Sequence, residues 1–272
     1  DPYSVIAAAS PGVPMQMRVV DNTLSNVRDK VSAEEWAVRV DLAACYRLVG
    51  HFGWDDLIFT HISARVPGTH DFLINPYGLM FDEMTASNLV RVDLSGKKTL
   101  ESPYEINPAG YTIHSAIHEA REDAGCVLHL HTMEGVAVSC QKAGLLPISQ
   151  QASIVVQSLS YHDYEGIALN PEEKVRLQAN LGDTRHLMLR NHGLLTVGRT
   201  VPDAFLAMFT FQRACEIQVL AQGNGAELIN IPQSVLDTVP GYTKAVMRGA
   251  GSALTWPALL RRMDRIDPGF RN

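Results

Sequence analysis

Residues 125–131 read Gly-Cys-Val-Leu-His-Leu-His, and this run constrains the fold more than any other part of the chain. Its apolar content is typical of a buried strand, in which successive side chains point to opposite faces of a sheet. His129 and His131 should therefore share one face, while Leu128 and Leu130 point to the other. The alternation predicts a central strand that presents two imidazoles at one point.

A third histidine follows another short apolar run. Residues 187–189 are Leu-Met-Leu, which is typical of a buried strand, and Asn191-His192-Gly193 continues with turn-forming residues. Gly193 is expected to adopt a backbone conformation closed to other residues, so that the chain turns sharply behind the His192 imidazole. Isolated histidines on strands are more often structural, hydrogen-bonded residues. Three that converge would instead suit a divalent metal ion with coordination positions left open.

The composition limits the classes of function. The 272 residues are 46% apolar, which is enough for a sizeable core, and one large domain is favoured over two small ones. The formal net charge is −6 and the 23 basic residues are spread along the chain, which argues against nucleic acid as a partner. No apolar run approaches the roughly eighteen residues that cross a bilayer, and the first residues carry no basic leader region. These features predict a cytoplasmic protein without a membrane span.

The four cysteines are far apart and lack the Cys-x-x-Cys spacing of metal and redox motifs. They lie within apolar helical or strand patterns, at Cys45, Cys126, Cys140 and Cys215. We expect four buried free thiols rather than disulfides.

Three segments are distinguished along the chain. Residues 1–31 show no sustained period and are expected to form an N-terminal arm that orders only by docking on a surface. The main domain is expected to span residues 32–222. Residues 223–272 have a weaker pattern and are expected to form a C-terminal extension that packs on another subunit or stays mobile.

Hydrophobic periods within the main domain predict helices mixed with short strands. Ser32 and Glu35 fit a capping box, which begins a helix of about eighteen residues that Gly50 ends. Further helices are predicted at residues 108–120, 134–142, 171–181 and 202–220. Strands are predicted at residues 57–60, 62–66, 72–74, 90–94, 125–131, 153–160 and 186–189.

Five segments, in their order and spacing, resemble the class II aldolase/adducin family. They are residues 54–63, 74–78, 129–131, 161–166 and 190–193. The resemblance implies an α/β fold of three layers, α/β/α, with a central, mostly antiparallel sheet flanked by helices. Enzymes of this family are usually fourfold-symmetric tetramers with active sites at subunit interfaces, so a homotetramer is also implied.

The resemblance assigns a metal-binding role to His129, His131 and His192. They match the three histidines that hold a divalent ion in the sugar-phosphate aldolases and epimerases of the family. In those enzymes the ion binds a ketone or enediolate oxygen and stabilises the negative charge that develops as a carbon–carbon bond breaks. Zinc is the expected ion here, with manganese and iron as alternatives.

Other parts of the family site are changed in this sequence. By spacing, the acidic residue that serves the aldolases as acid/base corresponds to Gly110, which has no ionisable side chain. The phosphate-binding pairs correspond to residues 60–61, 77–78 and 108–109. Tyr77 would fill the phosphate position, and a proline at 108 removes a backbone donor. The expected substrate is therefore a small molecule without a phosphate group.

His61 is the leading candidate to replace the missing acid/base. It lies in place of a phosphate-site asparagine, and an imidazole transfers protons near neutral pH. A hydrogen-bonded structural role fits the same residue equally well. Glu134 and Tyr161 are further catalytic candidates. Other histidines are expected to be structural: His114, His118 and His162.

Four residues are candidates for substrate contact. Tyr77 and Gly78 lie at the former phosphate site, and Arg190 could pair with a carboxylate, although arginines at strand ends more often form structural ion pairs. Gln151 corresponds to a tyrosine that reaches in from the neighbouring subunit in the aldolases. Because one insertion affects that alignment, the correspondence of Gln151 depends on how the gap is placed.

The leading hypothesis is a metal-dependent lyase that cleaves or forms a carbon–carbon bond in a small carbonyl or carboxylate substrate. Aldol cleavage and decarboxylation both fit the residues. An iron-dependent oxygenase on the same three histidines is one alternative. The other alternative is a non-catalytic oligomerisation or binding module, like the adducin head. A protein that has lost its enzymatic activity would also lack the acid/base residue and have an altered phosphate site.

Overall fold

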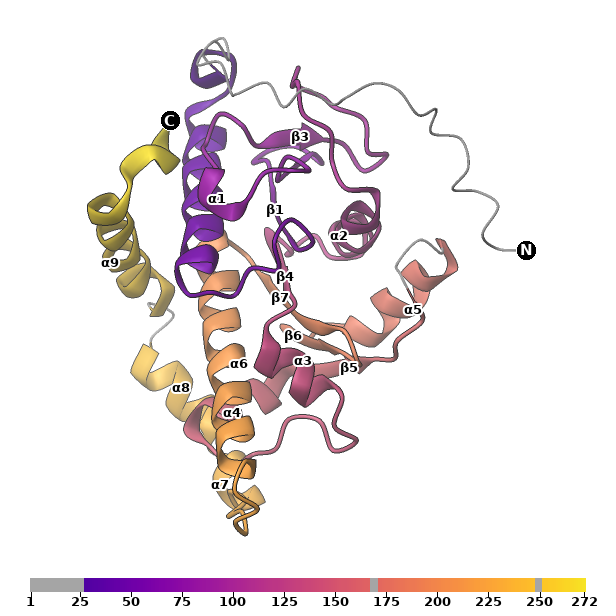
Figure 1. The fold of residues 1–272 in the computed structure, drawn as a ribbon, viewed down its shortest axis with the longest axis vertical. Coiled ribbons are helices and arrows are strands. Elements are labelled where there is room, and N and C mark those ends of the chain that lie inside the picture. Colours follow the sequence, from indigo (N-terminus) through magenta and orange to yellow (C-terminus); the bar gives the residue numbers. More distant parts are fainter. Residues whose placement is uncertain (1–26, 167–170, 248–250) are drawn as a thin grey trace.

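The structure is a computed structural model that describes residues 27–166, 171–247 and 251–272. Seven strands form one central sheet: β1 (His61–Arg65), β2 (Phe72–Ile74), β3 (Val90–Val92), β4 (Cys126–Leu130), β5 (Leu159–His162), β6 (His186–Leu189) and β7 (Gly193–Gly198). They lie in the order β3-β2-β1-β4-β7-β6-β5 (Figure 1). All neighbours pair antiparallel except β5 and β6, which are parallel. The expected mostly antiparallel sheet is confirmed.

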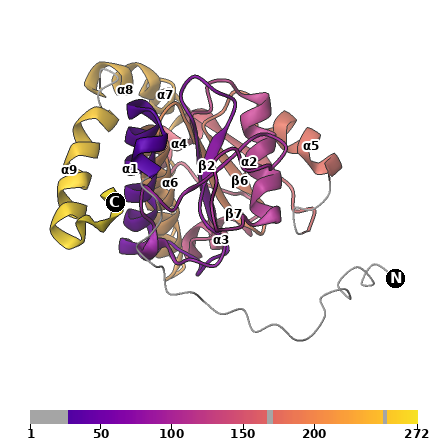
Figure 2. The same ribbon diagram turned by 90° about the horizontal axis from the view of Figure 1, so that it is seen from above.

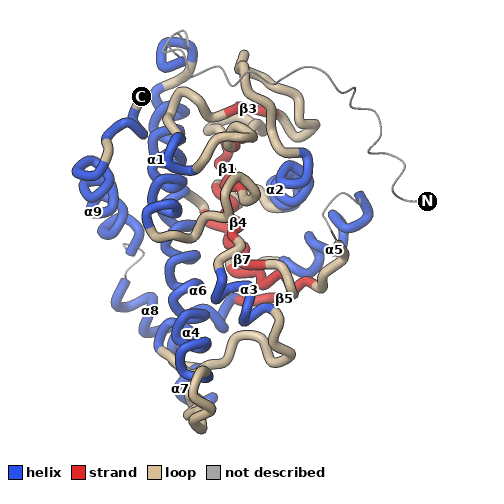
Figure 3. The backbone as a smooth tube through the Cα atoms, in the orientation of Figure 1, coloured by secondary structure: helices blue, strands red, loops and turns tan. Residues whose placement is uncertain are grey.

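Helices cover both faces of this sheet and complete three layers (Figures 2 and 3). The main ones are α1 (Ala33–His51), α2 (Pro108–Ala120), α3 (Met133–Ser139), α4 (Gln150–Val155), α5 (Pro171–Leu181) and α6 (Val201–Gln222). One face carries α1 and α6, the other carries α2 and α5, and both α3 and α4 contact α6. None of the described helices is both long enough and apolar enough to cross a bilayer.

The predicted alternation along the histidine strand is confirmed in β4. Leu128 and Leu130 belong to the core that α1 and α6 cover, whereas Val127 belongs to a second core shared with α2 and α5. His129, two residues after Val127, therefore lies on the α2 side of the sheet. This places an imidazole at the centre of the fold, flanked by β1 and β7.

Helix α1 begins where its sequence predicts and ends slightly later. The Ser32 hydroxyl accepts a hydrogen bond of 3.1 Å from the Glu35 N–H, which satisfies a donor at the helix start. The helix continues past Gly50 to His51. Gly53, with φ +68°, takes the left-handed conformation instead, so the prediction that Gly50 ends the helix is wrong.

Two predicted strands are wrong for local reasons. Residues 57–60 form a turn in which Leu57 has a positive φ of 52°. Residues 153–158 are helical, and β5 begins only at Leu159. The hydroxyl of Ser149 accepts a hydrogen bond of 3.1 Å from the Ala152 N–H and caps α4, which outweighs the β-branched composition of that segment.

All four cysteines are free, as predicted, but one of them is not buried. Cys140 is exposed because it caps the C-terminal end of α3, where the chain leaves the core.

The C-terminal part of the chain packs against the main domain. Beyond α7 (Gln233–Leu236) and α8 (Val239–Met247), helix α9 (Gly251–Ile266) lies against α1 and α6 (Figure 2). Trp256 is buried, stacks edge-on with Phe205 and donates a 2.8 Å hydrogen bond to Asp41. For residues 251–272, the prediction of a mobile tail is wrong, because Trp256 and its neighbours are buried against α1 and α6, whereas packing on another subunit stays a prediction.

A buried histidine makes the stability of the fold depend on pH. His186 is 5% exposed, its Nδ1–H donates to the Ser158 carbonyl, and burial lowers its pKa from 6.5 to about 4. Because the unfolded chain binds this proton more readily, the stabilisation is complete above pH 6.5 and is lost as the pH falls to about 4. We expect a loss on the order of 3 kcal/mol from this residue between pH 7 and pH 4. Urea unfolding of His186→Asn should show a shallower pH dependence than the wild type, and an unchanged slope would contradict the assignment.

Candidate metal centre

His129 presents one ring nitrogen that is free to bind a ligand. Its Nδ1–H donates a hydrogen bond of 3.0 Å to the carbonyl of Leu194 on β7. This bond holds the proton on Nδ1 and leaves a lone pair on Nε2. Burial, and then the neighbouring His192 and His131, keep the pKa of His129 well below its ordinary value of 6.5, so the ring is neutral.

His131 follows the end of β4. Its Nδ1 also carries a proton, but here the acceptor is a side chain rather than a backbone carbonyl. Its Nδ1–H donates a 2.9 Å hydrogen bond to the carboxylate of Asp56, in the loop after α1. A carboxylate in this position fixes the ring orientation and makes the opposite nitrogen more basic. Asp56 was not singled out by the sequence analysis. Its only signal is its place in residues 54–63, because nothing local shows that this loop returns to β4.

His192 lies in the tight turn between β6 and β7. Asn191 adopts the left-handed conformation of this turn, with φ +57°, and Gly193 does not. The prediction that Gly193 adopts a conformation closed to other residues is therefore wrong, although a glycine is still needed at this position. Glycine is required there because a Cβ atom would come within 2.4 Å of the Leu130 carbonyl oxygen. This close approach of two strands is what carries His192 to the end of β4.

The three imidazoles converge. Their ring centroids are 4.8 Å apart in every pair, and one nitrogen of each lies within 4.8 Å of the others. The Nε2 atoms of His129 and His131 are 3.1 Å apart, and the Nδ1–H of each ring is held by an acceptor outside the cluster. Three imidazole donors arranged in this way fit zinc, manganese or ferrous iron.

His61 lies directly beside this cluster. It pairs with His129 across β1 and β4 and is 3% exposed. Its Nδ1–H donates to the Asn75 side-chain oxygen at 3.1 Å, and its Nε2 accepts from the Asn107 amide at 3.0 Å. Burial lowers the pKa of His61 to about 4, so the ring is neutral.

The His61 ring occupies space that only glycine leaves open on α2. A Cβ atom on Gly110 would lie 2.1 Å from Cδ2 of His61 and 2.5 Å from its Nε2. A larger residue at position 110 is therefore incompatible with the observed position of the ring. The two residues form a complementary pair, with the missing side chain of one replaced by the imidazole of the other.

This geometry agrees with the sequence comparison. The family model for the Class II Aldolase and Adducin N-terminal domain matches residues 40–219. The chain belongs to the class II aldolase and adducin family.

Relatives extend this assignment beyond the matched domain. A Pseudomonas aeruginosa protein, named as a candidate class 2 aldolase, is 64% identical over 94% of this chain and 100% of its own length. Alpha-adducin of Rattus norvegicus is 43% identical over 87% of this chain, which spans only 34% of that protein. The crystal structure of an aldolase II superfamily protein from Pseudomonas syringae has 51% identity and a TM-score of 0.87, covering 90% of this chain and 99% of that one.

Two further catalytic candidates of this aldolase/adducin chain are engaged in other contacts. Glu134, in the first turn of α3, accepts a 2.9 Å hydrogen bond from the Gln212 amide on α6. The Tyr161 hydroxyl accepts one of 3.1 Å from the Leu145 N–H. Arg190, a candidate for substrate contact, stacks over the Tyr161 ring at 4.2 Å and donates to the carbonyl of Gln141. Tyr161 and Arg190 thus brace the loop after α3.

The other candidates for substrate contact lie at two separate places. Tyr77 is 41% exposed and Gly78 has a φ of +99°, which a side chain would strain, in the turn after β2. Gln151 is half-buried in the first turn of α4, which packs on α6. Among the described residues, no hydrogen bond joins Gln151 to the three histidines.

The remaining histidines of α2 are structural, as expected. The His114 Nδ1–H donates to the Ser63 hydroxyl at 2.6 Å, and that hydroxyl donates to His118 Nε2 at 2.7 Å. His118 in turn donates from Nδ1 to the carbonyl of Ala124. Burial lowers the pKa of His118 to about 3. This chain of bonds ties α2 to β1 and keeps Gly110 against His61.

Proposed function

We propose that this protein is a metal-dependent carbon–carbon lyase that acts on a small, non-phosphorylated carbonyl or carboxylate substrate. The observation that carries the proposal is the convergence of three imidazoles, two of them oriented by hydrogen bonds to Leu194 and Asp56. Family membership supports aldolase-type chemistry. We propose His129, His131 and His192 as ligands to zinc, with manganese and iron as alternatives.

The residues beside the cluster suggest how such a reaction would run. A divalent ion, when bound, would supply electrostatic stabilisation to an oxyanion that develops on the substrate. We propose that His61 transfers the proton, because it is neutral, lies next to His129 and replaces the acidic side chain that Gly110 lacks. Asn75 holds the proton on Nδ1, so proton transfer occurs at Nε2 once the amide of Asn107 is displaced.

The substrate class is proposed from the turn after β2. Tyr77 places an exposed phenol where the family aldolases bind phosphate, and Gly78 keeps the turn tight beside it. A phenol donates a single hydrogen bond and carries no positive charge, which suits a neutral hydroxyl or carbonyl group better than a phosphate. We propose that Gln151 completes the site from a neighbouring subunit of a homotetramer, as the corresponding tyrosine does in the aldolases.

A non-catalytic module is the second candidate. The 43% identity to alpha-adducin favours it. On this reading, the histidine cluster would be retained for folding, and Gly110 would mark the loss of the chemistry.

Elemental analysis of protein purified without added metal or chelator tests the proposal. We expect about one zinc, manganese or iron per chain, lost in His131→Ala and kept in the control His70→Ala, because His70 is exposed in the loop beyond the other end of β1. Iron would place oxygen chemistry ahead of carbon–carbon cleavage. No bound metal, together with no thermal stabilisation on adding these ions, would favour the non-catalytic module.

A further inference from the structure

The three clustered histidines differ in what orients them. His129 donates to a backbone carbonyl and His131 to the Asp56 carboxylate. No hydrogen bond joins the His192 ring to any of the described residues, although the ring is only partly exposed. A metal-binding histidine almost always donates from its second nitrogen to a carboxylate, a carbonyl or a water. The outer nitrogen of His192 therefore lacks the partner that its two neighbours have.

A small cavity borders His192. Its walls include His162 at the end of β5, Glu173 in the first turn of α5, and Tyr164 and Glu165 between them. The open space is about 10 Å³, which is enough for roughly one water molecule. The cavity is thus the size of a single bridging group.

Two buried polar atoms in this cavity wall lack partners. His162 is 4% exposed and Glu173 is 8% exposed, and neither His162 Nε2 nor Glu173 Oε2 has a hydrogen-bond partner among the described residues. The Nδ1–H of His162 donates to the Asn180 side-chain oxygen at 2.8 Å. Its Nε2 is 3.5 Å from Glu173 Oε1, and no hydrogen bond joins the two atoms.

Two more carboxylates line the wall: Asp163 is exposed, and Glu165 already has a partner. Glu165 accepts a hydrogen bond of 2.7 Å from Arg176 Nε and pairs with its guanidinium. Arg176 acts on Glu173 electrostatically, but no arginine or lysine of the described residues forms a hydrogen bond to Glu173 Oε2, so this oxygen still needs a donor inside the cavity. Buried polar groups left in this state are normally satisfied by an ordered water.

We propose that Glu173 is the positioning carboxylate of His192 and acts through one water held in this cavity. The water accepts the N–H of His192 and donates one hydrogen to Glu173 Oε2 and the other to His162 Nε2. Glu173 would then serve His192 as Asp56 serves His131. This inference rests on the proposed metal centre, and it adds a residue that touches neither metal nor substrate.

Metal affinity of the purified chain tests this role. Metal-free wild type, Glu173→Gln and Glu172→Gln are titrated with Co²⁺, whose visible absorption reports the ligand field, and with Zn²⁺ in competition with a chromophoric chelator. Loss of an outer-shell partner typically weakens metal binding by about 10- to 100-fold, and we expect this for Glu173→Gln. Glu172 is an exposed neighbour in the same helical turn, so Glu172→Gln should bind as the wild type does. Asp56→Asn serves as the positive control.

The outcomes separate this inference from the proposed function. Weakened binding with a metal-free melting temperature equal to that of the wild type supports a positioning role rather than a structural one. Equal affinity in wild type and Glu173→Gln, with Asp56→Asn weakened, would overturn the inference and leave the metal centre standing. No binding by the wild type would overturn both. If Glu173→Gln does not fold, Glu173→Asp, which keeps the charge but shortens the reach, should bind metal more weakly than the wild type, and wild-type affinity would count against the role.

Discussion

Gly110→Ala should force the His61 imidazole out of its observed position and destabilise the protein by about 1–3 kcal/mol. The new methyl group would lie 2.1 Å from Cδ2 of His61, far inside van der Waals contact. The His61 ring cannot move away without losing hydrogen bonds, because its side chain is buried and both ring nitrogens are hydrogen-bonded, one to Asn75 and one to Asn107. Chemical denaturation of the single variant measures the cost.

A double-mutant cycle shows whether the cost arises from His61. His61→Ala removes the ring that the methyl group would meet, so Gly110→Ala should cost little in that background. The coupling free energy should therefore be of the order of the single-mutant cost. Equal costs in the two backgrounds would mean that the alanine acts on α2 itself and that the two residues are not a complementary pair.

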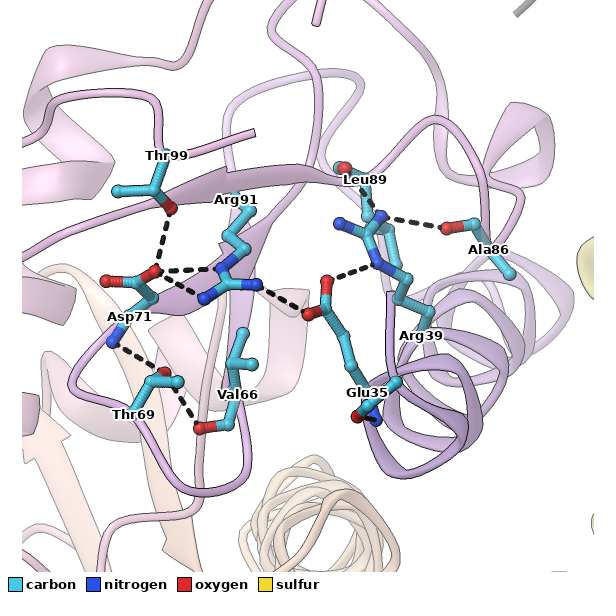
Figure 4. Close-up of polar contacts among 10 residues, drawn as sticks. Glu35, Arg39, Val66, Thr69, Asp71, Ala86, Leu89, Arg91 and Thr99 are labelled. Atoms are coloured by element: carbon cyan, nitrogen blue, oxygen red, sulfur yellow. Dashed lines mark hydrogen bonds and ion pairs between the residues drawn. The ribbon is translucent and has the colours of Figure 1, made fainter. Parts of the chain in front are cut away.

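Glu35→Ala should have the larger effect on stability, about 3–5 kcal/mol, because it leaves the buried Arg39 with backbone carbonyl partners but no countercharge. Arg39 is 0% exposed, and its Nε donates to Glu35 Oε1 at 2.9 Å (Figure 4). The other oxygen of Glu35 accepts a 2.7 Å bond from Arg91, which also pairs with Asp71. Burial already lowers the pKa of Arg39, which marks the cost of keeping its charge in the interior.

Matched variants separate the buried charge from the loss of a helix residue. Glu34 is the exposed neighbour in the same turn of α1, and Glu34→Ala should change the free energy of unfolding by less than about 0.5 kcal/mol. The double variant Glu35→Leu/Arg39→Met should recover much of the loss, because well-packed apolar residues can replace a buried ion pair. A loss below 1 kcal/mol for Glu35→Ala would show that Arg39 finds other partners in this pocket.

Much of the fold was predictable because its signals are local. The serine cap of α1, the alternation of β4 and the apolar periods of α2 and α5 are each contained within one element. The errors at residues 57–60 and 153–158 arose where β-branched or aromatic composition indicated a strand, while caps and turn conformations decided the structure. The C-terminal helices were missed although the buried Trp256 and Met263 recur at helical spacing in α9, because Pro257 interrupts the helical pattern there.

The sequence by itself determined which side chains could form the centre. A period of two puts His129 on a fixed face of β4, and a turn after an apolar run makes His192 available at a strand end. The family resemblance then identified the three histidines together. None of this required knowledge of distances.

Only the tertiary structure decided what surrounds those histidines. Asp56 reaches His131 from a position 75 residues earlier, His61 fills the space above Gly110, and Glu173 faces the cavity beside His192. Each relation joins elements that are distant in the sequence and adjacent in space. Side-chain periodicity fixes direction within one element, whereas the partner that a side chain meets depends on how separate elements pack, and packing is a property of the whole chain.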